Sequence, residues 1–402
     1  MRILVQKFGG SSVADLECMK KVRGKVLAAR EEGFDKIVVV LSARAGQTNS
    51  LLERAYQWSD EPDLAELDVL LTTGEQESVA LFAMLLQDAG VKARSILGFQ
   101  IPIVTDDAFG SARIDAIDAS RLHELFESYD VLVMAGFQGR TPDMRLTTLG
   151  RGGSDTSAVA IAAALGEGTR CDIYTDVDGV YTTDPRMCKA AHKMDRISYD
   201  EMLEMASMGA KVLQIRSVEI AEKYNVPVRV RSTFSNDPGT LLTKEDEMME
   251  SVLVSGIAFD KDQARITLCD VQDRPGTAAS IFNPLGEAGV VVDMIIQTAS
   301  RNGVTDMGFT VSRKDVKRSI AVLEKSGYDV SRIESASNVA KVSVVGVGMR
   351  NHSGVSGRCF DALYKAGINL IMISTSEVKI SCLIDEADLE LAVNVLHKEF
   401  EL

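Results

Sequence analysis

Buried strands that alternate with helices run through the N-terminal part of the chain, and this alternation restricts the possible fold most. The clearest strands are "ILVQKF" (3–8), "KIVVVLSA" (36–43) and "DVLVMAGFQG" (130–139), and helical patterns such as residues 77–90 lie between them. Strands that are apolar on both faces are typical of a mostly parallel sheet covered by helices on both sides. We therefore predict an α/β domain whose ligands bind where the carboxyl ends of strands open into loops.

Two stretches of the C-terminal part repeat each other at an offset of 78 positions. "IFNPLGEAGVVVDMIIQ" (281–297) aligns with "CFDALYKAGINLIMIST" (359–375), and Gly289 and Gly367 are among the identical pairs. Each copy predicts a βαββαβ unit. The polar stretch 235–251 separates this part from the α/β domain. The predicted domains are residues 1–245, 246–335 and 336–402.

Composition narrows the possible functions. The 402 residues carry a net charge of −14, which argues against a nucleic-acid partner. No apolar run is long enough to predict a membrane span, and the first ten residues lack the features of a signal peptide. The chain has six cysteines, none in a CxxC pair, and four histidines, so we do not expect a zinc site. We expect a cytoplasmic protein with reduced thiols, no membrane partner and no protein-bound metal.

Two glycine-rich loops, residues 7–12 and 150–156, follow predicted strands and precede helices. Such loops let backbone N–H groups approach phosphate, although a tight turn explains a glycine equally well. The sequence contains no GxxxxGK[ST] motif, no GxGxxG after a strand and no HRD or DFG set. A nucleotide site in this chain must therefore be of another kind.

Several side chains near these loops have both a functional and a structural interpretation. Lys7 is placed to meet phosphate, or else ends a strand at the surface. Arg151, between glycines, suits a carboxylate ligand or a surface salt bridge. Asp155 binds a ligand or caps its helix, and Glu75 is an acid in a predicted first helical turn. The string "YTDVDGVYTTDPR" (174–186) is either an Asx-rich turn or a nucleotide loop.

The order of the motifs resembles one family closely over essentially the whole chain. The chain resembles the aspartate kinases of the amino acid kinase superfamily, of the monofunctional bacterial type, and its C-terminal part resembles their two ACT domains. The motifs are "KFGGSS", "LTTGE", "GFQG", "TTLGRGGSDTSA", "YTDVDGVYTTDPR", "GAKVLQIRSVE" and "NVPVRVRSTFSNDPGT".

The resemblance implies ATP-dependent phosphorylation of the β-carboxylate of L-aspartate to 4-phospho-L-aspartate, the first step of lysine, threonine and methionine biosynthesis. It implies ATP and Mg²⁺ as cofactors, with the magnesium held mainly by ATP oxygens. A β-carboxylate has an unperturbed pKa of about 4, so it is already an ionised nucleophile and needs no general base. Catalysis then rests on positioning and electrostatics.

The resemblance also assigns residues. The implied catalytic residues are Lys7 and Asp155. The implied ATP-binding residues are Lys7, Gly9, Gly10, Ser42, Tyr174, Thr175, Asp176, Tyr181, Asp184 and Lys211. The implied aspartate-binding residues are Thr48, Glu75, Arg151, Gly152, Gly153 and Ser154. The implied effector-binding residues are Asp273, Gly276, Ala278, Asp293, Gln297, Asn369, Leu370, Ser376 and Glu377.

The expected effectors are lysine, threonine or both, acting by feedback through the ACT domains. The expected assembly is a homo-oligomer, or an α2β2 complex whose smaller subunit starts at Met248 or Met249. The codons for Lys-Glu-Asp upstream of these methionines can spell a purine-rich ribosome-binding sequence. Two alternatives remain from the sequence: a sibling kinase acting on glutamate, acetylglutamate or UMP, and a catalytically inactive amino-acid sensor.

Overall fold

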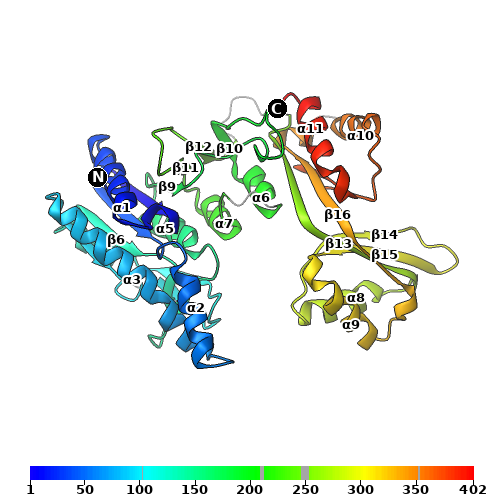
Figure 1. Cartoon of the computed structure of the whole chain (residues 1–402), viewed down its shortest axis with the longest axis horizontal. Coiled ribbons are helices and arrows are strands. Elements are labelled where there is room, and N and C mark those ends of the chain that lie inside the picture. Colours follow the sequence, from blue (N-terminus) through cyan, green and yellow to red (C-terminus); the bar gives the residue numbers. More distant parts are fainter. Residues whose placement is uncertain (102, 209–211, 246–252, 352–353) are drawn as a thin grey trace. The chain divides into compact units, whose positions relative to one another are not determined.

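A computed structural model of the chain describes residues 1–101, 103–208, 212–245, 253–351 and 354–402. The chain forms two compact units, which Figure 1 shows as ribbons coloured along the sequence. The first unit contains Met1–Val180, Lys193–Ser207 and residues 212–245. The second contains Tyr181–His192, Met208 and the described residues from 253 onward.

An eight-stranded sheet forms the centre of the first unit. Its strand order is β10-β12-β11-β9-β1-β2-β6-β3, and all neighbours are parallel except β11 and β12. This arrangement confirms the predicted mostly parallel sheet. The strands are β1 (Ile3–Phe8), β2 (Lys36–Leu41), β3 (Ala93–Ile96), β6 (Val131–Ala135), β9 (Arg170–Thr175), β10 (Arg196–Ser198), β11 (Val228–Ser232) and β12 (Thr240–Thr243).

Helices cover both faces of this sheet. Side chains alternate along β1, so Leu4 and Phe8 join the core beneath α1 and α3, whereas α5 packs on β1 and β9 from the opposite face. The helices are α1 (Leu16–Glu31), α2 (Gln47–Trp58), α3 (Leu64–Asp88), α4 (Ser120–Phe126), α5 (Gly153–Leu165), α6 (Tyr199–Ser207) and α7 (Ile215–Tyr224), with a 3-10 turn at Gly10–Val13.

A small second sheet lies in the same unit. Its order is β5-β4-β7-β8, formed by β4 (Ile103–Thr105), β5 (Ile114–Ile117), β7 (Gln138–Arg140) and β8 (Leu146–Thr148). Of the described helices, only α3 has the length and mean hydropathy that a membrane span requires. Its residues Val79, Phe82 and Leu86 are fully buried in the sheet core, so α3 has the packing of a core helix.

The second unit is built on one six-stranded antiparallel sheet with the order β14-β15-β13-β16-β18-β17. The strands are β13 (Gly256–Gln272), β14 (Val292–Gln297), β15 (Val304–Val311), β16 (Ile333–Val345), β17 (Met372–Thr375) and β18 (Lys379–Asp385). The helices are α8 (Thr277–Glu287), α9 (Val316–Lys325), α10 (Val355–Lys365) and α11 (Leu389–Glu399), and 3-10 turns lie at Arg313–Asp315, Val330–Arg332, Val347–Asn351 and Glu386–Asp388.

The two repeats of this unit share their long strands, which differs from the sequential order predicted at 246–335 and 336–402. Residues 265–268 of β13 pair with 333–336 of β16 in the first repeat, whereas residues 256–260 pair with 341–345 in the second. The second repeat therefore takes its fourth strand from the chain that precedes the first repeat. Both strands are long enough, at 17 and 13 residues, to serve two cores.

The segment Tyr181–His192 belongs to the second unit, although the predicted boundary at 245 places it in the first. The Thr182 carbonyl accepts a hydrogen bond from the Ile257 N–H at 2.7 Å, and the Thr182 hydroxyl lies 2.9 Å from Nε2 of buried His397. Cys188 is buried in the core of the second repeat. These contacts fix the loop that follows the predicted ATP strand to the second unit.

Candidate active site

Lys7 and Asp155 form a nearly buried ion pair at the carboxyl end of β1. Lys7 Nζ lies 2.6 Å from Asp155 Oδ1, and each side chain is only 12% exposed. Asp155 lies in the first turn of α5, whose N-cap is Gly152, so Asp155 does not cap the helix. The structure therefore does not support the capping interpretation of Asp155, whose carboxylate faces Lys7 instead.

The loops after β1 and β2 touch through their backbones. A Cβ on Gly10 would lie 2.8 Å from the Ala43 carbonyl oxygen, and the Ala45 N–H donates to the Gly10 carbonyl at 3.1 Å. The Ser42 N–H donates to the Phe8 carbonyl at 3.2 Å. Predicted residues Gly9, Gly10 and Ser42 are thus brought together beside Lys7, and Gly10 has no room for a side chain.

Glu75 projects from the middle of α3 rather than from the predicted helix start. Its side chain is 3% exposed, and Oε1 accepts a hydrogen bond from the Ala43 N–H at 2.9 Å. Oε2 is buried and has no hydrogen-bond partner among the described residues. Burial raises the pKa of Glu75 to about 7, against the opposing effect of the Ala43 bond. The buried Oε2 is suited to a cationic ligand group.

The loop that carries Arg151 bends at two glycines. Gly150 and Gly152 have φ values of 78° and 73°, a left-handed conformation that L side chains rarely adopt. The Arg151 side chain is exposed, whereas predicted residues Gly153, Ser154 and Asp155 are buried at the start of α5. The loop thus presents one cation to solvent beside a buried first turn. Thr48, also predicted, is partly buried in the first turn of α2.

This loop is fixed by three side chains that the sequence analysis missed. Asp68 of α3 is fully buried and accepts hydrogen bonds from the Thr148 N–H and hydroxyl, at 2.8 and 2.6 Å, and from the Gly110 N–H. Arg216 of α7 donates to the Leu149 carbonyl at 2.7 Å, and Gln214 Nε2 donates to the Arg151 carbonyl at 2.6 Å.

The available signals for these residues were weak. Gln214 and Arg216 lie inside the quoted motif "GAKVLQIRSVE", and Asp68 is a lone acid in an apolar helix. The local sequence does not show which distant backbone group a side chain will contact. These residues therefore could not be assigned to the Arg151 loop from the sequence.

The predicted nucleotide residues fall into separate places. Thr175 and Asp176 end β9, where the Thr175 hydroxyl donates to the Asp176 carboxylate at 3.0 Å. Tyr181 and Asp184 lie on the segment of the second unit, and Arg186 lowers the pKa of Asp184 through hydrogen bonds and charge. Lys211 lies outside the described residues.

Tyr174 lies on the opposite face of β9 from Thr175. Its ring is 1% exposed and stacks on Phe8 at a centroid distance of 4.5 Å, in the core beneath α1. Alternation along β9 points Tyr174 to this face and its neighbour Thr175 away from it. The ring of Tyr174 is therefore buried on the α1 face of the sheet, opposite to the face toward which Lys7 points.

No group of three or more His, Cys, Asp or Glu side chains that could hold a metal ion occurs within the described ranges.

The predicted effector residues are mostly exposed on the second unit. Gly276, at φ 94°, is the N-cap of α8, Ala278 lies in its first turn, and the Asp273 N–H donates to the Gly303 carbonyl. Asp293 on β14 pairs with buried Lys341. Strands β14 and β17 share an apolar cluster containing Met294 and Met372. This contact brings the β14 residues Asp293 and Gln297 near the chain around Asn369, Leu370, Ser376 and Glu377.

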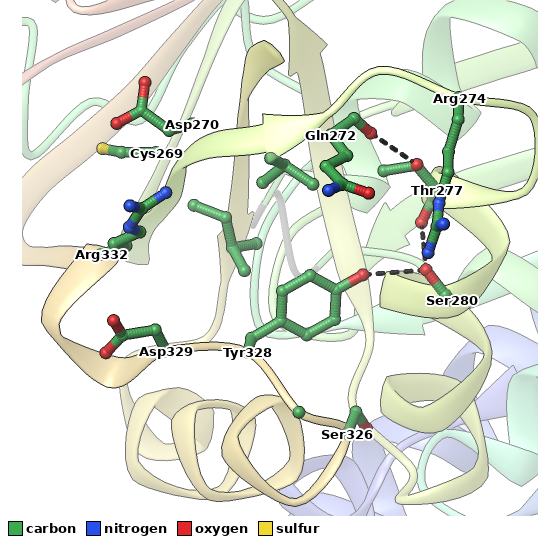
Figure 2. A pocket seen from close by; sticks show the side chains of 13 residues that line it. Cys269, Asp270, Gln272, Arg274, Thr277, Ser280, Ser326, Tyr328, Asp329 and Arg332 are labelled. Carbon is green, nitrogen blue, oxygen red and sulfur yellow. Dashed lines mark hydrogen bonds between the residues drawn. The ribbon is translucent and has the colours of Figure 1, made fainter. Parts of the chain in front are cut away.

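A cavity of about 460 Å³ opens beside the same loop but contains none of those residues. Figure 2 shows that Tyr328 directs its hydroxyl toward Ser280, 2.8 Å away, and that Thr277 bonds the Gln272 carbonyl. Arg274, Arg332, Asp270 and Asp329 also line the cavity. The cavity lies between α8 and the chain after α9, and none of the predicted effector residues lines it.

Comparisons with known proteins show the family to which both parts of the chain are similar. Residues 2–232 match the amino acid kinase family, and residues 265–336 and 342–400 each match an ACT domain. The aspartate kinase of Stutzerimonas stutzeri is 51% identical over 100% of this chain and 98% of its own length. The aspartokinase of Helicobacter pylori is 47% identical over 100% of this chain and 99% of its own.

Among solved structures, E. coli aspartokinase III in complex with aspartate and ADP has a TM-score of 0.82 and 28% identity, with 100% of both chains covered. The same enzyme in complex with lysine and aspartate has a TM-score of 0.78 and 29% identity, with 99% of both chains covered. The chain therefore belongs to the aspartate kinases of the amino acid kinase family, which transfer phosphate from ATP to aspartate, and it carries two ACT domains.

Proposed function

We propose that the Lys7–Asp155 pair marks the point where phosphoryl transfer to aspartate occurs. The observation that carries this assignment is the 2.6 Å ion pair, nearly closed to solvent, between two glycine-rich loops. Lys7 neutralises the transferred phosphate, and the N–H groups of Gly9 and Gly10 approach its oxygens. Asp155 holds Lys7 in this position until the nucleotide arrives.

Aspartate occupies the adjoining space in this proposal. Arg151, exposed on its loop, binds a carboxylate of aspartate, and the buried Oε2 of Glu75 receives the ammonium group. Thr48 and Ser154 add hydrogen bonds, and the backbone of Gly152 and Gly153 leaves room for the ligand. The β-carboxylate attacks the γ-phosphorus of ATP, and ADP leaves.

Mg²⁺, bound together with ATP, would supply positive charge beside the phosphates. Thr175 and Asp176 at the end of β9, with Ser42, Tyr181, Asp184 and Lys211, contribute to the nucleotide site. We also place the enzyme in the cytoplasm, in the pathway to lysine, threonine and methionine.

Substitution of Lys7 and Arg151 tests these roles. We expect Lys7→Ala to reduce kcat more than a hundredfold while the chain stays folded. Arg151→Ala should raise the KM for aspartate roughly 30- to 150-fold, as for a loss of about 2–3 kcal/mol of charge-assisted binding, with little change in the KM for ATP. Both kinetic constants are measured by trapping the acyl phosphate product with hydroxylamine. Glutamate serves as the control substrate. A near-normal kcat for Lys7→Ala would contradict the phosphate role.

We further propose that lysine, threonine or both inhibit the enzyme through its ACT domains. E. coli aspartokinase III has been solved in complex with lysine. A tenfold inhibition corresponds to about 1.4 kcal/mol of coupling between effector and catalytic states. Asp273→Ala and Ser376→Ala should relieve inhibition without lowering the uninhibited kcat. Wild-type enzyme that ignores both amino acids at millimolar concentration would show that the ACT domains serve assembly alone.

The assembly is either a homo-oligomer or an α2β2 complex with a smaller subunit started at Met248 or Met249, which lie outside the described residues. Expression of the native gene with a C-terminal tag distinguishes the two, since only the second gives an additional short tagged chain.

A further inference from the structure

A second polar cavity lies in the first unit, on the α1 face of the sheet. Its volume is about 260 Å³, and its walls come from β1, α1, β9 and the β11 region. Gln6 and Tyr174 form its floor, Lys25 comes from α1, and Arg170 and Arg231 come from the strands. Side-chain alternation separates it from the candidate active site, because Gln6 and Lys7 point to opposite faces of β1.

Positive charge exceeds negative charge around this cavity, in a chain whose net charge is −14. Three cations, Lys25, Arg170 and Arg231, line it with two carboxylates, Asp172 and Glu32. Arg170 already holds fully buried Asp172 through two hydrogen bonds of 2.8 and 3.0 Å, and it also lies 3.8 Å from Glu32. Asp172 and Glu32 are therefore paired mainly with Arg170.

Lys25 has no carboxylate partner among the described residues, and Arg231 shares Asp172 with Arg170. Within that described part, Lys25 Nζ donates to two uncharged oxygens, the Ser235 carbonyl and the Asn236 side chain. Arg231, 16% exposed, reaches Asp172 only at 3.4 Å, and its buried Nε has no hydrogen-bond partner among the described residues. Burial and the neighbouring Arg231 lower the pKa of Lys25, as expected for a partly buried lysine beside another cation.

Gln6 adds an unsatisfied polar group to the same space. Its side chain is 1% exposed, its Nε2 lies 3.5 Å from the Tyr174 hydroxyl, and its Oε1 has no partner within the described part of the chain. A half-turn of the amide would let Oε1 accept from Tyr174 and direct Nε2 into the cavity. Buried polar atoms without partners are rare, and a bound ligand or water supplies the missing bonds.

We propose that this cavity binds a phosphate group, with Lys25 and Arg231 as its cationic ligands and the Gln6 amide, oriented by the Tyr174 hydroxyl, as an uncharged donor. Donors that converge from one helix and two strands suit a tetrahedral anion, and an arginine offers it two parallel N–H groups. The volume holds inorganic phosphate with room for a small ester group. The ligand is therefore inorganic phosphate or a small phosphate monoester.

Thermal unfolding of the full chain with inorganic phosphate tests this proposal, with sodium chloride at equal ionic strength as the salt control. Saturating phosphate should raise the Tm of the wild type by about 2–4 °C beyond the salt control. Lys25→Met should lose at least half of this shift, and calorimetric titration should show at least tenfold weaker phosphate binding. Lys20→Met is the matched control, since Lys20 lies on the same helix and pairs with Glu17 at the surface.

Two further arms separate the cavity from the active site and identify the ligand. Lys7→Ala removes the proposed active-site phosphate ligand, and it should keep the phosphate response. If glycerol phosphate binds more tightly than inorganic phosphate, the ligand of the cavity is a phosphate monoester. If inorganic phosphate binds more tightly, the ligand is free phosphate. A response that Lys25→Met retains in full, or that Lys7→Ala abolishes, overturns the proposal.

Discussion

Glu75 is the most unusual side chain of the candidate site, because it is a carboxyl group almost closed to solvent. Its pKa of about 7 exceeds the ordinary value of 4.5, and burial is the main cause. Between these two values the folded chain binds more protons than the unfolded chain does. The free energy of unfolding should therefore fall as the pH rises from about 4.5 to 7, and become level above that range.

The expected size of this effect is testable. From pH 5 to pH 8 Glu75 should contribute a loss of roughly 2–3 kcal/mol, which Glu75→Gln abolishes. Urea denaturation of both proteins at the two pH values measures the difference. Glu77→Gln is the control, since Glu77 lies on the same helix but pairs with Arg44 near the surface. Equal pH dependence of wild type and Glu75→Gln would show that burial does not raise this pKa.

At the scale of elements, the start of α7 holds the loop that carries Arg151. Gln214 and Arg216 bind carbonyl oxygens on either side of Gly150. A Cβ on Gly152 would lie 1.9 Å from Gln214 Cγ, so the glycine makes room for this helix. We regard both side chains as positioning residues for Arg151.

Substitutions at this contact should affect aspartate more than ATP. Gln214→Ala should raise the KM for aspartate about fivefold to tenfold, as for one lost hydrogen bond of about 1–1.5 kcal/mol. Gly152→Ala should have a larger effect, because it adds a positive-φ strain and a steric clash.

Combining Gly152→Ala with Gln214→Gly removes the clash, so the double variant should lose less than the sum of the two single losses. Initial-rate kinetics with both substrates measures these effects, and equal rises in both KM values would argue against a positioning role.

At the scale of the whole molecule, the two ACT repeats depend on each other through β13 and β16. Ile257 and Ile266 both lie on β13 and are buried to 1% and 0% exposure. Ile257 belongs to the core with α10 and α11, whereas Ile266 belongs to the core with α8 and α9. The strand therefore connects two cores through one continuous backbone.

A matched pair of variants shows which core each half of β13 supports. Ile257→Ala and Ile266→Ala should each cost about 2–4 kcal/mol. Hydrogen exchange should rise in α10, α11 and β18 for Ile257→Ala, and in α8, α9 and β15 for Ile266→Ala. If the repeats folded in simple sequential order, both variants would instead raise hydrogen exchange in α8 and α9.

The sequence by itself determined the parts of this protein that depend on local periodicity. The apolar strands with helices between them predicted the parallel sheet, and the repeat at an offset of 78 predicted two similar C-terminal units. For the glycines around Arg151 the sequence left open either a tight turn or a close approach to a ligand, and Gly150 and Gly152 do have positive φ values.

Only the tertiary structure decided which distant residues meet. The pairing of Lys7 with Asp155, and of Gln214 with the Arg151 carbonyl, joins positions far apart in the chain. Strand 256–260 pairs beyond its own repeat, and the register of β9 turns Tyr174 into the core. Local patterns set which face of an element is apolar, but the partner of that face depends on packing over the whole chain.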